Sequence, residues 1–504
     1  MIHLDGTSLT LDALSSIALG HAPVALSPDA VARVQASRAV VDRHAALPHA
    51  VYGINTGFGA LAEVPIPKDQ LAALQLNLLR SHAAGVGDPL SIPETRAVMA
   101  LRANVLAKGR SGIRLETLQA LLALLNAGVT PHVPSRGSVG ASGDLAPLAH
   151  LALVLVGEGA CRASGGPEQG RQALSRAGLT PVTLAPKEGL ALINGTQAST
   201  GVLALAVLSA ARLARAADIA AAMSIDALRG SAHPFDARIH AARPVPGQAA
   251  SARNLRSLLD GSAINASHVN CGKVQDAYAL RCAPQVHGSA REAIGFAHRL
   301  AEIEANSATD NPMVFAEEGE IISGGNFHGA PIALAADTLT IGLAQLATIS
   351  ERRTDRMMTP HESGLPAFLT RDSGLNSGFM MAHVTAAALT AEIKTLSHPA
   401  AVDTIPTSAG REDHVSMSMG AALKAARVLE LATQVIAIEL MAAAQAIDLL
   451  APLATSPALA AIHAAIRADV PMLGDDRPPS PEITTIASMV MTGALERACP
   501  LQLA

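Results

Sequence analysis

Aromatic side chains are almost absent from this 504-residue chain, which has no tryptophan, two tyrosines and seven phenylalanines. Hydrophobic residues still make up 49% of the sequence, so its core must be built from alanine, leucine, valine and isoleucine. Because small aliphatic side chains allow close helix–helix approach, this composition favours packed helices. The two tyrosines, Tyr52 and Tyr278, are either ordinary half-buried rings or groups kept for chemistry and binding.

Charged residues are also scarce, at 16% against about 25% in an ordinary domain. The formal net charge of −5 argues against a nucleic-acid partner bound through a basic face. The four cysteines lie far apart without a C-x-x-C pair, which argues against a disulfide scaffold or a zinc module and fits a reducing cytoplasm. These cysteines are Cys161, Cys271, Cys282 and Cys499.

Signals for membrane insertion are missing as well. Residues 1–5 lack the basic start of a signal peptide, and charged residues interrupt the apolar stretches from Gly201 and Val428 before the roughly 20 residues that a spanning helix needs. We therefore expect a soluble, cytoplasmic protein with no membrane partner.

Helical periodicity dominates the sequence after its first ninety residues. Leucines at 118, 121, 122 and 125 share one helical face, and Gly128 is placed to end that helix. A second long apolar run begins near Ala425, and Pro452 is a natural stop. Two-residue alternation is rare. We predict a mainly α protein, in which a loop-rich N-terminal unit (residues 1–110) precedes a large bundle of long helices (residues 111–504).

Common catalytic motifs are absent too. There is no phosphate-binding G-x-x-x-x-G-K-[ST], no complete dinucleotide fingerprint and no G-x-S-x-G elbow. The 18 histidines include no H-E-x-x-H, so we expect no metal site.

The most distinctive segment is residues 137–150, GSVGASGDLAPLAH. If the backbone bends tightly at Ala141-Ser142-Gly143, the Gly143 amide nitrogen can attack the Ala141 carbonyl carbon. Loss of two waters, one involving the Ser142 hydroxyl, then gives an electrophilic methylidene-imidazolone ring. Glycine supplies an unhindered nitrogen and backbone freedom, and alanine keeps the bend uncrowded.

The triplet alone is weak evidence, because Ala163-Ser164-Gly165 repeats it in a glycine-rich segment. We interpret that copy as a plain surface turn. Only the first copy lies in a rigid frame between Pro134 and Pro147 and runs directly into an apolar helical stretch, so we assign the ring to Ser142.

Residues 137–150 resemble the signature of the aromatic amino-acid ammonia-lyase family, most closely its histidine type. Further blocks in family order extend the resemblance across most of the chain. They are residues 52–59, 81–87, 194–196, 275–282, 310–312, 324–328, 374–379, 403–409 and 412–417. The resemblance implies that the ring is made from Ala141, Ser142 and Gly143, with no external cofactor, in a homotetramer whose active sites combine residues from several subunits.

Roles for individual residues follow from the same resemblance. Tyr52 is the candidate base, because a phenol in a dehydrated site can be tuned towards phenolate. Asn194 is expected near the ring carbonyl. Arg281 suits the substrate carboxylate through two parallel hydrogen bonds, although a lone arginine is more often part of a surface ion pair. Gln275 is a further donor to the carboxylate or the ring, and Tyr278 and Phe327 help to shape the pocket.

The substrate is expected to be L-histidine, converted to trans-urocanate and ammonia. His82 and Glu412 match the histidine type, in which a histidine and a carboxylate hold the substrate's imidazole. A plainer interpretation of Glu412 is a surface salt bridge with Arg411.

Several positions depart from the histidine-type pattern, and they leave two alternatives open. They are Ala277, Ala279, His383, Ile393, Gly410 and Arg411. The first alternative is a tyrosine or phenylalanine ammonia-lyase or an aminomutase of the same family. The second is a catalytically silent helical scaffold that never forms the ring.

Overall fold

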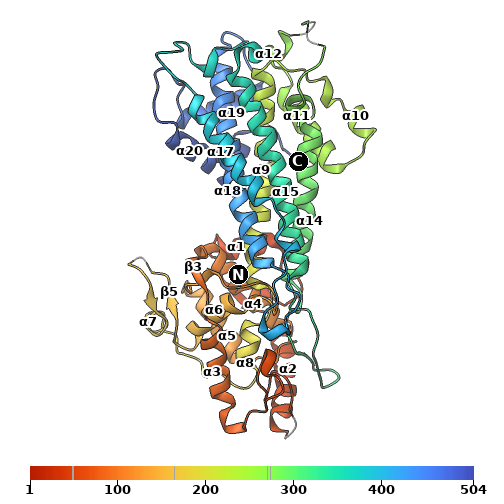
Figure 1. Ribbon diagram of the computed structural model, residues 1–504, viewed down its shortest axis with the longest axis vertical. Helices are drawn as coiled ribbons and strands as arrows, with labels where there is room; N and C mark the ends of the chain where they lie inside the picture. Colours follow the sequence, from red (N-terminus) through yellow and green to blue (C-terminus); the bar gives the residue numbers. More distant parts are fainter. Residues whose placement is uncertain (48–49, 164, 269–270, 273) are drawn as a thin grey trace. The chain divides into compact units, whose positions relative to one another are not determined.

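The computed structural model describes residues 1–47, 50–163, 165–268, 271–272 and 274–504, which form two compact units interleaved along the chain (Figure 1). Unit 1 holds residues 1–205, 297–337 and 399–424, and unit 2 holds residues 206–296, 338–398 and 425–504. Residues 1–110 lie wholly in unit 1, whereas residues 111–504 are shared by both units. A domain boundary at residue 110 stays a prediction. The second Ala-Ser-Gly triplet contains Ser164, which lies outside the described residues.

Unit 1 combines short helices with all the strands found in the described chain. Its helices are α1 (Leu11–Ala18), α2 (Pro28–Ala46), α3 (Leu71–His82), α4 (Ile92–Ala107), α5 (Leu115–Asn126), α6 (Leu145–Leu155), α7 (Gly170–Arg176) and α8 (Glu188–Ile193). Four two-stranded sheets pair β1 (Ile2–Leu4) with β2 (Val24–Leu26), β3 (Val86–Pro89) with β4 (Pro134–Arg136), β5 (Ala160–Cys161) with β6 (Glu168–Gln169), and β7 (Met313–Phe315) with β8 (Glu320–Ile322). Only β1–β2 is parallel, with Ile2 opposite Val24.

Unit 2 consists of helices and the loops that join them, with no strand in its described part. It holds α10 (Ala237–Ala241), α11 (Pro246–Leu259), α12 (Ala263–Ala266), α13 (Tyr278–Arg281), α16 (Pro360–Ser363), α17 (Met380–Leu396), α19 (Pro457–Asp469), α20 (Ser480–Thr492) and α21 (Ala494–Ala498). The four longest helices contribute to both units: α9 (Gln197–Ala227), α14 (Ala283–Ala305), α15 (Ala330–Met358) and α18 (Ser418–Leu449). The prediction of a mainly α fold with long helices and little sheet is confirmed.

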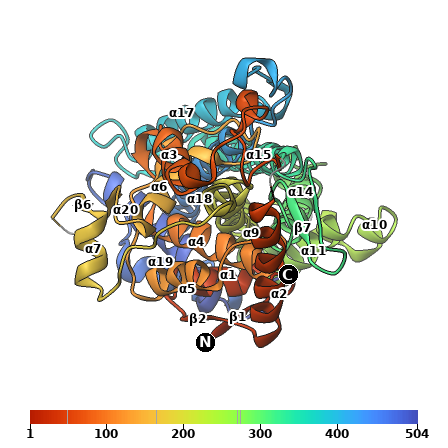
Figure 2. The same ribbon diagram turned by 90° about the horizontal axis from the view of Figure 1, so that it is seen from below.

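The core of unit 1 forms where α4 packs against α1 and α5 (Figure 2). Helix α4 begins with a capping box in which Ser91 and Glu94 satisfy each other's backbone amides, and it is buried from Thr95 to Ala107. Helix α5 buries the predicted leucine face, and Gly128 follows its end with a φ of +70°. The periodicity therefore identified a real core helix and its stop.

Helix α18 is longer than its sequence pattern suggested. It begins at Ser418 rather than near Ala425 and ends at Leu449, before Pro452. Helices α15 and α18 are both long and apolar enough to cross a membrane by length and composition, contrary to the prediction from the sequence. Their most apolar windows are 67% and 89% buried inside the protein, as is usual for core helices.

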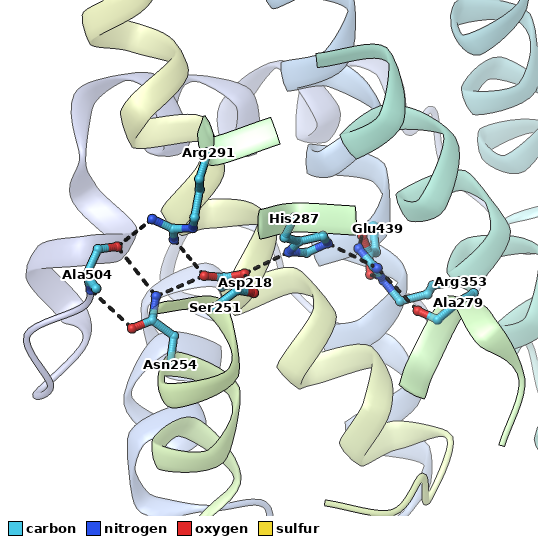
Figure 3. A network of polar contacts seen from close by, with 9 residues as sticks. All are labelled: Asp218, Ser251, Asn254, Ala279, His287, Arg291, Arg353, Glu439 and Ala504. Carbon is cyan, nitrogen blue, oxygen red and sulfur yellow. Dashed lines mark hydrogen bonds and ion pairs between the residues drawn. The ribbon is translucent and has the colours of Figure 1, made fainter. Parts of the chain in front are cut away.

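Within unit 2, a chain of buried charged groups joins the long helices (Figure 3). Arg353 on α15 forms a bidentate ion pair with Glu439 on α18, with an Nη2–Oε2 distance of 2.9 Å, and both side chains are fully buried. His287 on α14 lies 2.7 Å from Asp218 on α9, and Arg291 lies 2.6 Å from the other Asp218 oxygen. Burial lowers the pKa of His287, so the neutral ring donates from Nδ1 to Asp218 and presents Nε2 to Arg353, 3.4 Å away.

We predict that Arg353→Met destabilises the protein strongly, because Glu439 then remains buried without its cation. Breaking a buried pair in this way costs about 3–5 kcal/mol, which calorimetric unfolding would detect as a lower Tm. Arg427→Met is the control, since Arg427 forms exposed pairs with Glu392 and Glu430 and should leave Tm nearly unchanged. Equal Tm values for the two variants would contradict the prediction.

Candidate active site

The loop between β4 and α6 carries the first Ala-Ser-Gly triplet and bends at two glycines. Gly140 and Gly143 have φ values of +67° and +71°. A Cβ atom on Gly143 would lie 2.3 Å from the Gly195 carbonyl oxygen, and one on Gly140 would lie 2.2 Å from the Ser416 hydroxyl oxygen. Both positions therefore require glycine, for space as well as for backbone conformation.

Two segments that are remote in sequence clamp this loop. The Asp144 amide donates to the Gly195 carbonyl at 2.7 Å. On the other side, the Met417 amide donates to the Val139 carbonyl at 2.7 Å, and the Ser416 hydroxyl donates to the Gly140 carbonyl at 2.8 Å. The bend is thus fixed by tertiary contacts rather than by its own sequence alone.

Asp144 anchors the loop through side-chain hydrogen bonds. It is fully buried and accepts hydrogen bonds from the Ser138 hydroxyl at 2.8 Å and from the Ser199 amide and hydroxyl at 2.7 and 2.8 Å. Burial raises the pKa of this carboxyl group, although these hydrogen bonds act in the opposite direction. Asp144 belongs to the segment singled out from the sequence, but its role as an anchor was not predicted.

Ser142 is held at both of its oxygen atoms. Its hydroxyl donates to Oε1 of Glu412 at 3.1 Å, and its carbonyl accepts from Nδ2 of Asn194 at 3.3 Å. The other Glu412 oxygen, Oε2, accepts from the Thr407 hydroxyl. Glu412 is thus occupied by Ser142 and Thr407, whereas the nearest carboxylate partner of Arg411 is Glu63 at 3.6 Å. Among the described residues, Arg411 is thus paired with Glu63 rather than with Glu412, and the site role of Glu412 stays a prediction.

Asn194 follows α8 directly, and a buried arginine fixes its backbone. Arg102 is fully buried and donates to the Asn194 carbonyl at 2.7 Å and to Oε1 of Gln197 at 2.6 Å. The Oδ1 atom of Asn194 is buried and has no hydrogen-bond partner among the described residues. An unpaired buried acceptor beside Ser142 is costly unless a ligand donates a hydrogen bond to it. Arg102 carried no motif in the sequence, so its role could not be predicted.

Tyr52 is half-buried in the glycine loop that precedes α3, and its ring meets Phe58 edge-on, with 6.4 Å between centroids. Burial raises the pKa of the Tyr52 phenol, and the negative charges of Glu412 and Asp310 raise it further. The expected tuning towards phenolate is therefore not present in this state of the chain. A Tyr52 base would need a positive charge or a hydrogen-bond donor near its oxygen, brought by the substrate.

His82 closes α3 on the same unit. Its Nδ1 atom lies 2.9 Å from the Leu78 carbonyl, and burial lowers the pKa of the imidazole although Leu78 and Glu412 oppose this. The ring is therefore neutral at pH 7, with its proton on Nδ1 towards the carbonyl and Nε2 left as an acceptor. Phe327, also in unit 1, is partly buried two residues before Gly329, whose amide donates to the Gly140 carbonyl at 3.3 Å.

The remaining three predicted residues belong to unit 2. Gln275 and Arg281 line a pocket of about 820 Å³, and the Arg281 guanidinium lies over the Tyr278 ring, 4.6 Å from its centroid. Arg281 also donates to the Asp276 carbonyl at 3.0 Å. Arg353, from the buried network, donates to the Ala279 carbonyl at 3.4 Å and so braces helix α13 (Figure 3).

The predicted residues thus fall into two groups. Unit 1 contains Tyr52, His82, Ala141, Ser142, Gly143, Asn194, Phe327 and Glu412, and unit 2 contains Gln275, Tyr278 and Arg281. Of the positions that depart from the family pattern, His383 pairs with Glu351 at 3.0 Å and Ile393 is fully buried. These two have structural contacts of their own within unit 2.

Comparisons with known proteins identify the family of the whole chain. The family model for aromatic amino acid lyases matches residues 9–468. The chain is 58% identical over 502 residues to a histidine ammonia-lyase of Anaeromyxobacter sp. (strain K), an alignment that covers 98% of this chain and 99% of that protein.

Solved structures give the same result. The histidine ammonia-lyase of Trypanosoma cruzi superposes with a TM-score of 0.91 at 46% identity, covering 99% of this chain and 94% of that one. The tyrosine aminomutase of Streptomyces globisporus superposes with a TM-score of 0.95 at 40% identity and covers 100% of both chains. Since the family model spans most of its length, this chain belongs to the aromatic amino acid lyase family.

Proposed function

We propose that this protein is a carbon–nitrogen lyase that eliminates ammonia from L-histidine and releases trans-urocanate. The observation that carries the proposal is the carboxylate of Glu412, which contacts Ser142 of the triplet in the same unit as a neutral His82. A carboxylate and an imidazole acceptor suit the N–H groups of a substrate imidazole and offer nothing to an unsubstituted phenyl ring. The 58% identity to a histidine ammonia-lyase supports the same substrate.

The electrophile in this proposal is the methylidene-imidazolone ring formed from Ala141, Ser142 and Gly143. Two features of the unmodified chain fit the ring: the left-handed bend at Gly143, and the Nδ2 atom of Asn194, which donates to the carbonyl oxygen of Ser142 that the ring would keep. When formed, the ring supplies an electron-poor carbon that takes up the substrate's amine and makes it a better leaving group. Asn194 would hold the Ser142 carbonyl throughout.

The other proposed residues bind and deprotonate the substrate. Arg281, with Gln275, binds the substrate carboxylate through charge-assisted hydrogen bonds. His82 and Glu412 orient the imidazole, and Phe327 and Tyr278 bound the pocket. Tyr52 removes the β-proton. No external cofactor is needed for these roles.

We further propose a cytoplasmic homotetramer with active sites shared between subunits. Large apolar side chains remain exposed on the single chain, including Val274 (97% exposed) and Tyr278 (71% exposed) beside the proposed carboxylate site and Met381 (60% exposed) on α17. Large apolar side chains that are exposed on the single chain support burial against other subunits.

A second candidate is an aminomutase acting on tyrosine, favoured by the TM-score of 0.95 to the Streptomyces globisporus enzyme. We predict that the purified protein forms urocanate from L-histidine and forms neither coumarate nor cinnamate from tyrosine or phenylalanine. Absorbance spectra and chromatography of the products distinguish these acids from β-amino acids. Turnover of tyrosine without turnover of histidine would favour the second candidate instead.

Ser142→Ala should abolish turnover and leave the oligomer intact, because the methylidene carbon of the ring comes from the serine side chain. Intact mass should show wild-type protein lighter than its sequence by two waters and the variant without the full loss. Ser164→Ala in the second triplet is the matched control and should behave as wild type. An unmodified wild-type mass would instead support the silent-scaffold alternative.

Tyr52→Phe should lower kcat by about 10²- to 10⁴-fold, the usual contribution of general base catalysis. Because burial raises the pKa of Tyr52, its phenolate is the minor form at pH 7 and increases about tenfold per pH unit below that pKa. The wild-type kcat/KM should therefore rise with pH more steeply than that of the variant. The substrate's amino group titrates identically with both proteins, so parallel pH profiles would argue against Tyr52 as the base.

A further inference from the structure

We propose that Glu412 also acts before any substrate binds, as the proton donor for loss of the Ser142 hydroxyl during ring formation. This inference rests on the proposed function, since it assumes that the ring forms. Its basis is the unmodified chain itself, in which the Ser142 hydroxyl oxygen lies 3.1 Å from Oε1 of Glu412. The same carboxyl group would thus serve maturation first and substrate binding afterwards.

Loss of the hydroxyl needs an acid because hydroxide is a poor leaving group. A positioned side chain that protonates a leaving oxygen commonly accelerates such a step by about 10²- to 10⁴-fold. In the neutral carboxyl form of Glu412, the contact with Ser142 runs in the reverse sense, so that Oε1–H donates to the serine oxygen. Of the two side chains that contact Ser142 among the described residues, Glu412 and Asn194, only Glu412 has a carboxyl group that can act as this acid.

Thr407 fixes which carboxyl oxygen carries that proton. Its hydroxyl donates to Oε2 of Glu412, so the proton of a neutral carboxyl group is left on Oε1, the atom that faces Ser142. The backbones of the two residues are paired as well, with the Thr407 amide donating to the Glu412 carbonyl at 3.0 Å. This pairing limits the rotation of the carboxyl group away from the loop.

Asn194 acts on the opposite side of the same residue. Removal of the Ser142 Cα proton places negative charge on the Ser142 carbonyl oxygen, which accepts from Nδ2 of Asn194 at 3.3 Å. A hydrogen-bond donor aimed at an oxygen that becomes negative stabilises the transition state. Ser142 is therefore held at the leaving oxygen and at the oxygen that receives charge.

The atoms balance without an oxidant or any other reactant. A bond forms between the Gly143 nitrogen and the Ala141 carbonyl carbon, and that carbonyl oxygen leaves as the first water with the amide hydrogens of Gly143 and Ser142. The Cα–H bond of Ser142 then breaks, its proton passes to the carboxylate of Glu412, and its electron pair forms the Cα=Cβ double bond. The hydroxyl leaves with that proton from Glu412 as the second water, and Glu412 is again a carboxylate.

The test measures intact mass at timed intervals after cell-free synthesis of the full chain, so that it does not depend on enzyme activity. Glu412→Gln should slow loss of the second water at least tenfold and accumulate chains that retain it. Thr407→Val, which removes no charge, should slow the same step to a smaller extent. The matched control is Asp413→Asn, an exposed neighbour that should mature at the wild-type rate. Added formate should accelerate maturation of Glu412→Ala, in which the carboxyl group is missing.

The outcomes separate the two proposals. If Glu412→Gln loses both waters at the wild-type rate but does not turn over histidine, Glu412 serves the substrate alone and this inference is wrong. If wild-type protein never loses water, the proposed function is wrong as well. If Glu412→Gln does not fold, as judged by circular dichroism and gel filtration, Thr407→Val decides, and a wild-type rate in that variant overturns the inference.

Discussion

The constraint on which the rest of this site depends is the fixed bend of residues 137–144. Two glycines with positive φ create the bend, and the segments around Gly195 and Met417 lock it through backbone hydrogen bonds. Loops usually run over the protein surface and are more mobile than the elements that they connect. Here, a fully buried carboxyl group, Asp144, ties the loop to α9 through Ser199, so that the bent backbone is held by the surrounding unit.

The polar groups around the bend contact Ser142 in the unmodified chain, and they would contact the substrate in the proposed enzyme. In the unmodified chain, Glu412 and Asn194 hold the two oxygens of Ser142, and one buried acceptor, Oδ1 of Asn194, has no partner among the described residues. The same carboxylate raises the pKa of Tyr52 and opposes the lowering of the His82 pKa by burial. The negative charge of Glu412 therefore disfavours the phenolate of Tyr52 in this state, and the same charge would attract a protonated substrate imidazole.

The second unit positions the guanidinium of Arg281 at the end of a short helix. Helix α13 spans only Tyr278–Arg281 and is too short to be stable alone. Its Ala279 carbonyl accepts from Arg353, which belongs to a buried network that joins α9, α14, α15 and α18. The long helices thus provide a rigid frame. The buried ion pairs between them favour one way of packing, because any other packing would leave a buried charge without its partner.

The sequence by itself determined the fold class, and it supplied the choice of triplet and the candidate residues as predictions, because periodicity, glycine placement and short motifs are local properties. The leucine face of α5 and the stop at Gly128 needed no tertiary information. By contrast, only the tertiary structure decided that Glu412 contacts Ser142 rather than Arg411, that Arg102 holds Asn194, and that burial raises the pKa of Tyr52. These features depend on side chains brought together from distant segments, and neither desolvation nor hydrogen bonding between such segments can be derived from their order along the chain.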